Sequence, residues 1–292
     1  MEYIGEHILI GTIGQAFISI AFSAAILAAY SFYKSSINES LKSEWLPLAR
    51  GSFYIHGISV LGIIVCMFIM IYNHYFEYQY VWQHSSKSLP TRYMISCFWE
   101  GQEGSFLLWI FWNILLGLIL IRISKKWEAR VLTIVSTIQA FLSSMLIGIY
   151  VANIKIGSSP FVLVRNLDEN IGLPWTQMEN YLQIVPQFMD GRGLNPLLQN
   201  YWMVIHPPIL FLGFSLTMIP FCYAIAALWK KEYSKWINQA IPWAYAGISI
   251  LGTGILMGGV WAYESLSFGG FWAWDPVENS SLVPWIILVA AA

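Results

Sequence analysis

The aromatic and acidic residues of the stretch FGGFWAWDPVENSSLVPW have the most evident capacity of any in this sequence to bind a ligand. Four aromatic side chains fall within seven residues, namely Phe268, Phe271, Trp272 and Trp274. Gly269 and Gly270 permit a tight bend among them. An apolar wall beside a polar helix start suits a large planar amphipathic ligand. A belt of tryptophans at the headgroup depth of a membrane explains the same residues, and residue types alone leave both interpretations open.

Asp275, Pro276 and Glu278 have the types and spacing of a helix start. Aspartate is a favoured N-cap, proline suits the first helical position, and a glutamate three residues after the cap completes a capping box. We therefore predict that a helix begins here and that both carboxylates accept its first backbone N–H groups. A carboxylate occupied in this way is a poor metal ligand.

His206 is the histidine whose position suggests a ligand most directly. It precedes Pro207-Pro208, and because proline is tolerated in the first turn of a helix, we expect His206 at a helix start. A neutral imidazole there could ligate iron, although a capping or interfacial histidine is the alternative. The remaining histidines are not distinguished from one another: His7, His56, His74 and His84. No residue has the setting of a catalytic nucleophile or base.

Long apolar runs decide the fold class. The chain of 292 residues is 57% hydrophobic and 11% charged, and six runs each hold roughly the 20 residues that cross a bilayer. The runs cover 8–32, 53–76, 105–123, 131–153, 205–229 and 241–263, and a seventh begins near Ser281. We predict an all-α, polytopic transmembrane bundle with six full spans and a truncated seventh. We interpret residues 1–292 as a single membrane domain that forms the N-terminal part of a longer protein.

Basic residues predict the orientation of these spans. Ten of the 15 lysines and arginines lie after runs one, three and five, so those loops are expected in the cytoplasm. The N-terminus and the segments 76–104, 154–204 and 264–280 are then external, and a capping box at Thr176–Glu179 predicts a short surface helix at 176–184. The net charge of −1 indicates no nucleic-acid partner. Cys66, Cys97 and Cys222 form no C-x-x-C pair and are expected to pack inertly.

Four blocks together resemble one family of membrane haem-handling proteins. GGFWAWDPVENSSLVPW resembles the tryptophan-rich WWD motif, while EGQEGSFLLW, LNPLLQN and HPPILFLG resemble companion motifs of the cytochrome c maturation protein F (CcmF) branch, a haem lyase subunit. The resemblance implies an external haem platform formed by Gly269, Gly270, Trp272, Trp274, Asp275, Pro276, Glu278 and Asn279, to which the aromatic wall adds Phe271. It implies that His206 is an axial ligand of the haem iron. Phe268 replaces the first tryptophan of the motif, and Gln102 stands where many relatives have histidine.

The resemblance also implies a role in cytochrome c biogenesis at the bacterial inner membrane, with the WWD segment on the periplasmic side. Haem from a haem chaperone would be held on the platform and attached covalently to apocytochrome c, together with other haem lyase subunits and within membrane lipid. A second external histidine and the two ligands of a membrane b-type haem would lie beyond residue 292. Two alternatives are a haem exporter or adaptor that uses the WWD motif without ligation, and a multispan transporter. The transporter is disfavoured because the centres of the six runs lack Asp, Glu, Lys and Arg.

Overall fold

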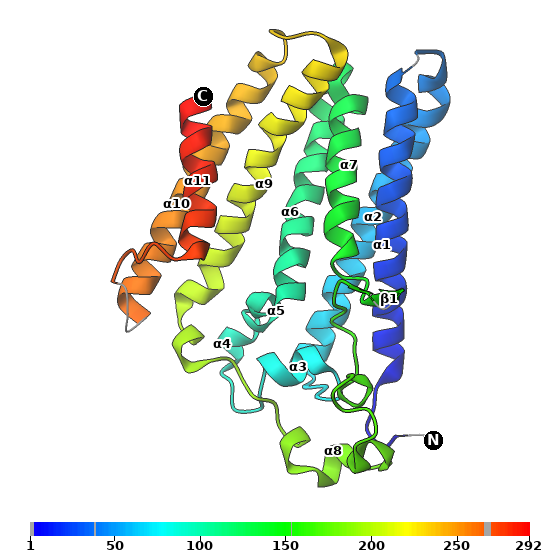
Figure 1. Ribbon diagram of the computed structural model, residues 1–292, viewed down its shortest axis with the longest axis vertical. Coiled ribbons are helices and arrows are strands. Elements are labelled where there is room, and N and C mark those ends of the chain that lie inside the picture. Colours follow the sequence, from blue (N-terminus) through cyan, green and yellow to red (C-terminus); the bar gives the residue numbers. More distant parts are fainter. Residues whose placement is uncertain (1–2, 38, 153, 266–269) are drawn as a thin grey trace. The chain divides into compact units, whose positions relative to one another are not determined.

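A computed structural model describes residues 3–37, 39–152, 154–265 and 270–292, and most of them are helical (Figure 1). The contacts divide the chain into two compact units. Unit 1 contains residues 1–21, 58–107 and 143–199, and unit 2 contains residues 22–57, 108–142 and 200–292. Long helices contribute to both units, since α1 and α2 each pass from one unit to the other.

Five helices in the described part of the chain are long and apolar enough to cross a membrane. They are α1 (Ile8–Ile37), α2 (Glu39–Tyr72, of which Lys42–Tyr72 is the candidate span), α6 (Gln102–Ile123), α9 (Tyr201–Lys230) and α10 (Ile237–Ser265). In lipid a helix satisfies its own backbone hydrogen bonds, which is why apolar runs of this length fold as helices. The predicted class, an all-α membrane bundle, is confirmed.

The fourth apolar run departs from the expectation of a continuous helix over 131–153. Helix α7 (Glu128–Ser144) has only 17 residues and is not among the five. An antiparallel hairpin of β1 (Ile149–Val151) and β2 (Ile154–Ile156) follows it. Gly148 has a left-handed φ of 65° at the entry to the hairpin, and the β-branched residues beyond it favour strands. The sequence pattern indicated that these residues are hydrophobic, but it did not indicate the change from helix to hairpin.

Unit 1 consists of short elements besides the ends of the long helices. The α-helical ones are α3 (Gln79–His84), α4 (Thr91–Met94), α5 (Cys97–Glu100) and α8 (Tyr181–Ile184), and the 3₁₀ turns are η2 (Val164–Asn166), η3 (Pro174–Gln177), η4 (Pro186–Phe188) and η5 (Pro196–Leu198). The capping box predicted at Thr176 is wrong, because its hydroxyl donates to the Leu173 carbonyl (2.7 Å) within a 3₁₀ turn. The predicted surface helix is reduced to η3 and α8.

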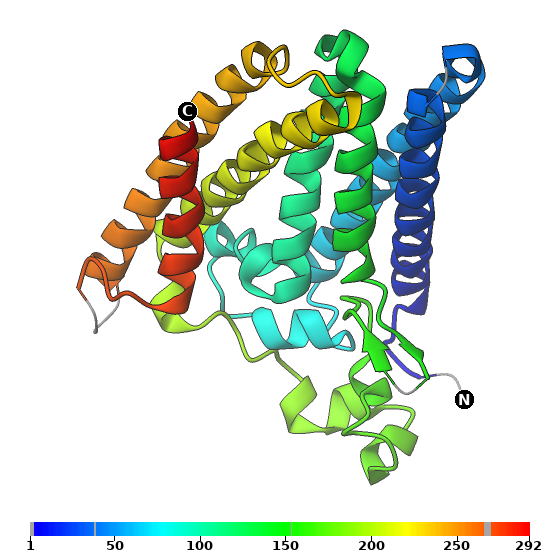
Figure 2. The ribbon, with the colours of Figure 1, turned by 45° about the horizontal axis from the view of Figure 1, so that its top comes forward.

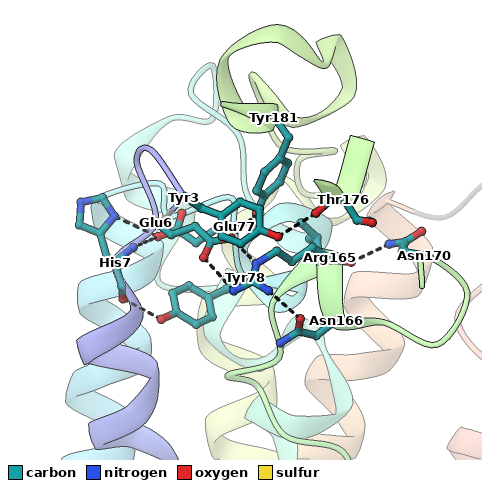
Figure 3. Close-up of polar contacts among 11 residues, drawn as sticks. Tyr3, Glu6, His7, Glu77, Tyr78, Arg165, Asn166, Asn170, Thr176 and Tyr181 are labelled. Atoms are coloured by element: carbon teal, nitrogen blue, oxygen red, sulfur yellow. Dashed lines mark hydrogen bonds and ion pairs between the residues drawn. The ribbon is translucent and has the colours of Figure 1, made fainter. Parts of the chain in front are cut away.

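A polar network holds the segments of unit 1 together (Figure 3). The Arg165 guanidinium donates to both carboxylate oxygens of Glu6 (2.7 and 3.2 Å), and the Tyr181 hydroxyl donates to the same carboxylate (2.9 Å). The Glu77 carboxylate accepts from the backbone N–H of His7 and lies 2.9 Å from its ring Nδ1. Residues 6 and 7 are thereby joined to segments 70 or more positions away.

Unit 2 contains a large apolar core. Most of the basic residues of unit 2 lie close in sequence to its helix ends at residues 37, 123, 128 and 230. Figures 1 and 2 show these helix ends. Phe32, Phe53 and Trp127 are essentially inaccessible within this core. Helix α9 returns toward these basic ends, where the 3₁₀ turn η1 (Lys125–Trp127) connects α6 to α7. We call this part of unit 2 the basic end. The three cysteines are buried thiols, as expected of packing residues.

Candidate functional site

The predicted ligand residues gather at the other end of unit 2, where α9 begins, α10 ends and α11 (Pro276–Ala291) begins (Figure 2). We call it the Trp-rich end. Helices α9 and α10 lie in close contact, since a Cβ added at Gly213 would approach the Leu251 Cα to 2.6 Å. The Trp202 indole N–H donates to the Glu264 carboxylate (2.6 Å), and this bond joins the start of α9 to the end of α10. The two helices form the frame of the site.

His206 lies deeper in α9 than expected. The helix begins at Tyr201, and the Asn200 side chain caps it by accepting from the Met203 backbone N–H, so Pro207 and Pro208 stand inside the helix. The side chain of His206 is consequently not at a free lip but is buried, with only 9% exposed. Its ring fills the space beside Gly258, where an added Cβ would lie 2.9 Å from the ring Cε1.

Three buried nitrogen atoms at the Trp-rich end have no hydrogen-bond partner among the described residues. They are His206 Nδ1, Trp261 Nε1 and Trp272 Nε1. All three side chains line the same cavity of about 140 Å³, which Asp275, Glu278 and Ser281 also border. The His206 and Trp261 rings are 5.8 Å apart between centroids. Buried polar groups are nearly always paired in folded proteins, so three orphans around one cavity indicate a site for a polar ligand group.

The WWD segment differs from a flat wall. Trp272 and Trp274 contact each other edge to face, with centroids 5.7 Å apart and planes at 84°. The backbone is not extended here, because Trp274 has a left-handed φ of 59°. The Trp274 side chain is 68% exposed and that of Phe271 is 43% exposed. The Phe271 ring packs over Gly259, where an added Cβ would lie 2.5 Å from its Cε1.

Hydrogen bonds from the start of α11 fix this backbone conformation. The Asp275 carboxylate accepts from the N–H groups of Val277 (2.7 Å) and Glu278 (2.8 Å), and the Glu278 carboxylate accepts from the N–H of Asp275, so the predicted capping box is confirmed. Glu278 also accepts from the Ala273 N–H (2.9 Å), and Asn279 donates to the Trp274 carbonyl (2.9 Å). These polar residues therefore hold the aromatic segment in place.

A second, apolar hollow lies on the other side of Trp272. Its volume is about 350 Å³, and it is lined by Gly252, Ile255, Leu256, Phe271, Trp272, Trp274, Leu282 and Trp285. The Trp285 indole N–H donates to the Ile248 carbonyl (2.8 Å), which attaches α11 to α10. Pockets for organic ligands usually exceed about 300 Å³, so the apolar hollow reaches that range and the cavity at His206 does not.

The predicted residues are thus brought together only in part. His206, Trp272, Asp275 and Glu278 border one cavity, whereas Phe271 and Trp274 border the other. Gly270 has a left-handed φ of 62°, as its predicted bend requires, while Gly269 and Phe268 lie outside the described residues. Pro276 is the first residue of α11, as predicted.

Sequence reasoning missed Trp261. It lies on α10 three residues after Gly258 and seven after Gly254, so the three positions share the helix face that meets α9. That spacing was a usable signal for a residue facing the start of α9. Gln102, the departure from the family pattern, begins α6 in unit 1.

A family model described as "Cytochrome C assembly protein" matches residues 99–292. The chain belongs to this family. The match begins at Trp99, immediately before the first of the four motif blocks, and includes all four completely. The family membership confirms the resemblance on which the prediction of a haem-handling site rests.

Curated relatives of the family are similar along most of the chain. The cytochrome c-type biogenesis protein CcmF of Haemophilus influenzae is 31% identical over 274 residues, which cover 92% of this chain and 38% of the relative. CcmF of Escherichia coli is 31% identical over 282 residues (94% and 39%), and the probable biogenesis protein NrfE of that organism is 34% identical over 222 residues (74% and 35%). The chain spans about two fifths of the length of these relatives.

A solved structure named cytochrome c heme lyase CcmF has the same fold. It is 25% identical, with a TM-score of 0.74, and the match covers 96% of this chain and 41% of that one. The helical arrangement described above is therefore shared with a family member along nearly the whole chain.

Proposed function

We propose that this chain handles haem during cytochrome c biogenesis, and that the Trp-rich end holds haem as a substrate for covalent attachment to apocytochrome c. The observation that carries the proposal is the set of three unpartnered nitrogens, on His206, Trp261 and Trp272, around one cavity. Haem offers an iron that an imidazole can ligate and carboxylates that can accept from indole N–H groups. The names of the CcmF relatives support the same role.

The residues contribute in different ways. In this proposal His206 is an axial ligand of the iron, and its burial keeps it in one position. The indole N–H groups of Trp261 and Trp272 would donate to a carboxylate of the same haem, and the porphyrin would extend beyond the cavity, whose volume of about 140 Å³ is too small to enclose it. Phe271 and Trp274 would contact the ring from the apolar hollow.

The polar residues of the WWD segment act through the backbone. Asp275, Pro276, Glu278 and Asn279 hold α11 and the left-handed Trp274, while Gly270 provides the bend. A ligand held in one orientation reacts faster and with one stereochemistry, because the entropy of alignment is already lost. Haem would be supplied by a haem chaperone and attached to apocytochrome c together with other haem lyase subunits. We further propose that any membrane b-type haem takes its ligands from outside this chain.

We propose a topology of six membrane crossings and a seventh begun by α11, with the N-terminus and the WWD segment in the periplasm. Helix α7 would be the short fourth crossing, since 17 residues extend about 25 Å and lie at the lower limit for a span. Segments 76–104, 154–204 and 264–280 would then be external. In a variant without native cysteines, Lys155→Cys should be labelled by an impermeant thiol reagent in intact cells and Lys125→Cys should not. The opposite pattern would contradict this topology.

The haem proposal is tested by substitutions that remove the indole N–H group together with part of the ring, and a control makes the same change at another tryptophan. Trp261→Phe and Trp272→Phe in the full-length protein should each lower the haem content by about tenfold at limiting haem, since a hydrogen bond to a charged group contributes roughly 1.5–3 kcal/mol. Trp236→Phe is the control, because its N–H donates to the Tyr233 carbonyl (2.9 Å) near the other end of α10. Equal haem content in all three variants would contradict the proposal.

Cytochrome c maturation, measured in the same cells, shows whether haem bound at this site goes on to be attached covalently to apocytochrome c. Loss of haem binding together with loss of covalently labelled cytochrome is expected for a lyase subunit. A variant that fails to bind haem while maturation continues would contradict a role of this site in cytochrome c maturation.

A further inference from the structure

A small cavity at the basic end of unit 2 has the composition of an anion site. Its volume is about 120 Å³, and it lies between the end of α1, the start of α2 and the connection from α6 to α7. The charged residues that line it are Lys42, Lys125, Lys126, Glu128 and Arg130. The helices that border it include the ends of three candidate spans, so the cavity lies where helices leave the apolar part of a membrane.

Basic side chains outnumber acids among the described residues that line the cavity, and the acid among them, Glu128, is paired from outside. Glu128 accepts from Arg50 through both carboxylate oxygens (2.6 and 2.7 Å), and its side chain is only 7% exposed. Arg50 does not line the cavity, so this pair neutralises Glu128 from outside. Lys126 pairs with Glu232, which does not line the cavity (3.3 Å), so Lys125 and Arg130 are the lining cations on which the electrostatic argument rests.

Two buried donors that line the cavity have no hydrogen-bond partner among the described residues. They are the Ser35 hydroxyl, on a side chain that is 96% buried, and Nε of Arg130. The Arg130 guanidinium is held in place, since its Nη2 donates to the Ser36 carbonyl (3.0 Å). A buried donor left unpaired costs free energy, and an acceptor bound in the cavity would remove that cost.

We propose that this cavity binds a phosphate group, either of an anionic phospholipid headgroup or of a soluble phosphate. Phosphate offers several acceptor oxygens to a hydroxyl, a guanidinium and ammonium groups. The volume suits one small anionic group and is well below that of an ordinary pocket for an organic ligand. Basic pockets between helices at a membrane surface bind anionic lipid headgroups in this way. The site is separate from the haem proposal, and neither depends on the other.

The test is the affinity of the purified full-length protein for phosphatidylglycerol, measured by native mass spectrometry with phosphatidylcholine as the neutral comparison. Ser35→Ala removes only an unpartnered hydroxyl and should weaken phosphatidylglycerol binding about tenfold. Lys125→Gln should weaken it by about fivefold. Lys235→Gln is the matched control, since this exposed lysine follows α9 and does not line the cavity, and it should change the affinity less than twofold.

Inorganic phosphate, added alone, distinguishes the two sources. If phosphatidylglycerol binding depends on Ser35 and inorganic phosphate does not raise the unfolding temperature, the ligand is a lipid headgroup. If inorganic phosphate raises the unfolding temperature in a manner that depends on Ser35 and phosphatidylglycerol binding does not depend on Ser35, the ligand is a soluble phosphate. The proposal is overturned if neither probe depends on Ser35. Equal affinity for the neutral and anionic lipids, or a loss in Lys235→Gln as large as in Ser35→Ala, would also overturn it.

Discussion

The polar network of unit 1 and the Trp-rich end of unit 2 use similar residues in opposite ways. In unit 1, His7 lies against Glu77, and Tyr181 donates to a carboxylate that also binds Arg165 (Figure 3). At the Trp-rich end, the buried nitrogens His206 Nδ1 and Trp261 Nε1 have no partner among the described residues. A satisfied buried network contributes to stability, whereas an unsatisfied one favours whatever ligand completes it. Substitutions should therefore destabilise the protein in the first region and change ligand binding in the second.

The largest effect is expected from Arg165→Met. The Glu6 side chain is fully buried, and the guanidinium is its charged partner in the network. Removing one partner of a buried pair leaves an uncompensated charge and costs about 3–5 kcal/mol of unfolding free energy. Denaturant unfolding in detergent measures this loss. The double variant Arg165→Met/Glu6→Gln should recover part of it, and no recovery would show that the charge is not the cause.

A matched pair of substitutions compares the two regions directly. Tyr181→Phe removes a hydroxyl that donates to the Glu6 carboxylate (2.9 Å), so it should lower the unfolding free energy by about 1.5–3 kcal/mol. Trp261→Phe removes an N–H that has no partner among the described residues, so the ligand-free protein should lose little stability through that N–H. Similar losses in the ligand-free protein would break the contrast between satisfied and unsatisfied groups.

The pH dependence of unit 1 should come partly from Glu77. Burial raises the pKa of its carboxyl above the ordinary value of 4.5, against the opposing effect of His7. The folded protein then binds the proton more tightly than the unfolded chain, so this contribution to stability is present below pH 4.5 and is lost as pH rises through the raised pKa. The loss is about 1.4 kcal/mol for each unit of the rise.

Glu77→Gln removes this titration while keeping the shape of the side chain. The unfolding free energy of the wild type should therefore fall relative to that of Glu77→Gln as pH rises above 4.5. Parallel pH profiles of the two proteins would contradict the assignment.

The smallest effect is expected from substitutions of Asp275, which test whether the acids of the WWD segment act as capping groups. Asp275→Asn and Asp275→Ser should retain the helix start, because both residues cap well, whereas Asp275→Ala should cost about 1 kcal/mol of local stability. Hydrogen exchange of the first turn of α11 measures this cost, and haem content measures its consequence. If Asn and Ser reduce haem content as much as Ala, the carboxylate has a direct ligand role.

Some of these features could be predicted from neighbouring residues in the sequence, and others could not. The capping box at Asp275 and Glu278 was predictable because every bond in it joins residues within three positions. The start of α9 was not, because the proline pair suggested a boundary while the cap at Asn200 lies six residues before His206. The end of α7 was missed because hydropathy continues into the hairpin.

The candidate site shows the same division. The family motifs pointed to His206 and Trp272, which border one cavity. Trp261 was missed because its role depends on the packing of α9 against α10 and not on its own neighbours in the sequence. The left-handed φ of Trp274 had no local signal either, since it is maintained by the Asn279 side chain and the α11 cap.

The absorption spectrum of haem bound to His206→Ala is the most direct test of the central claim. Loss of an axial ligand changes the coordination of the iron, so the spectrum and the reduction potential of the external haem should change even where some haem stays bound. His56→Ala is a useful control, because that histidine is buried beside Gln139 and lies outside the Trp-rich end. The account predicts an altered spectrum and impaired cytochrome c maturation for His206→Ala alone. An unchanged spectrum with normal maturation would show that His206 is only a packing residue of α9.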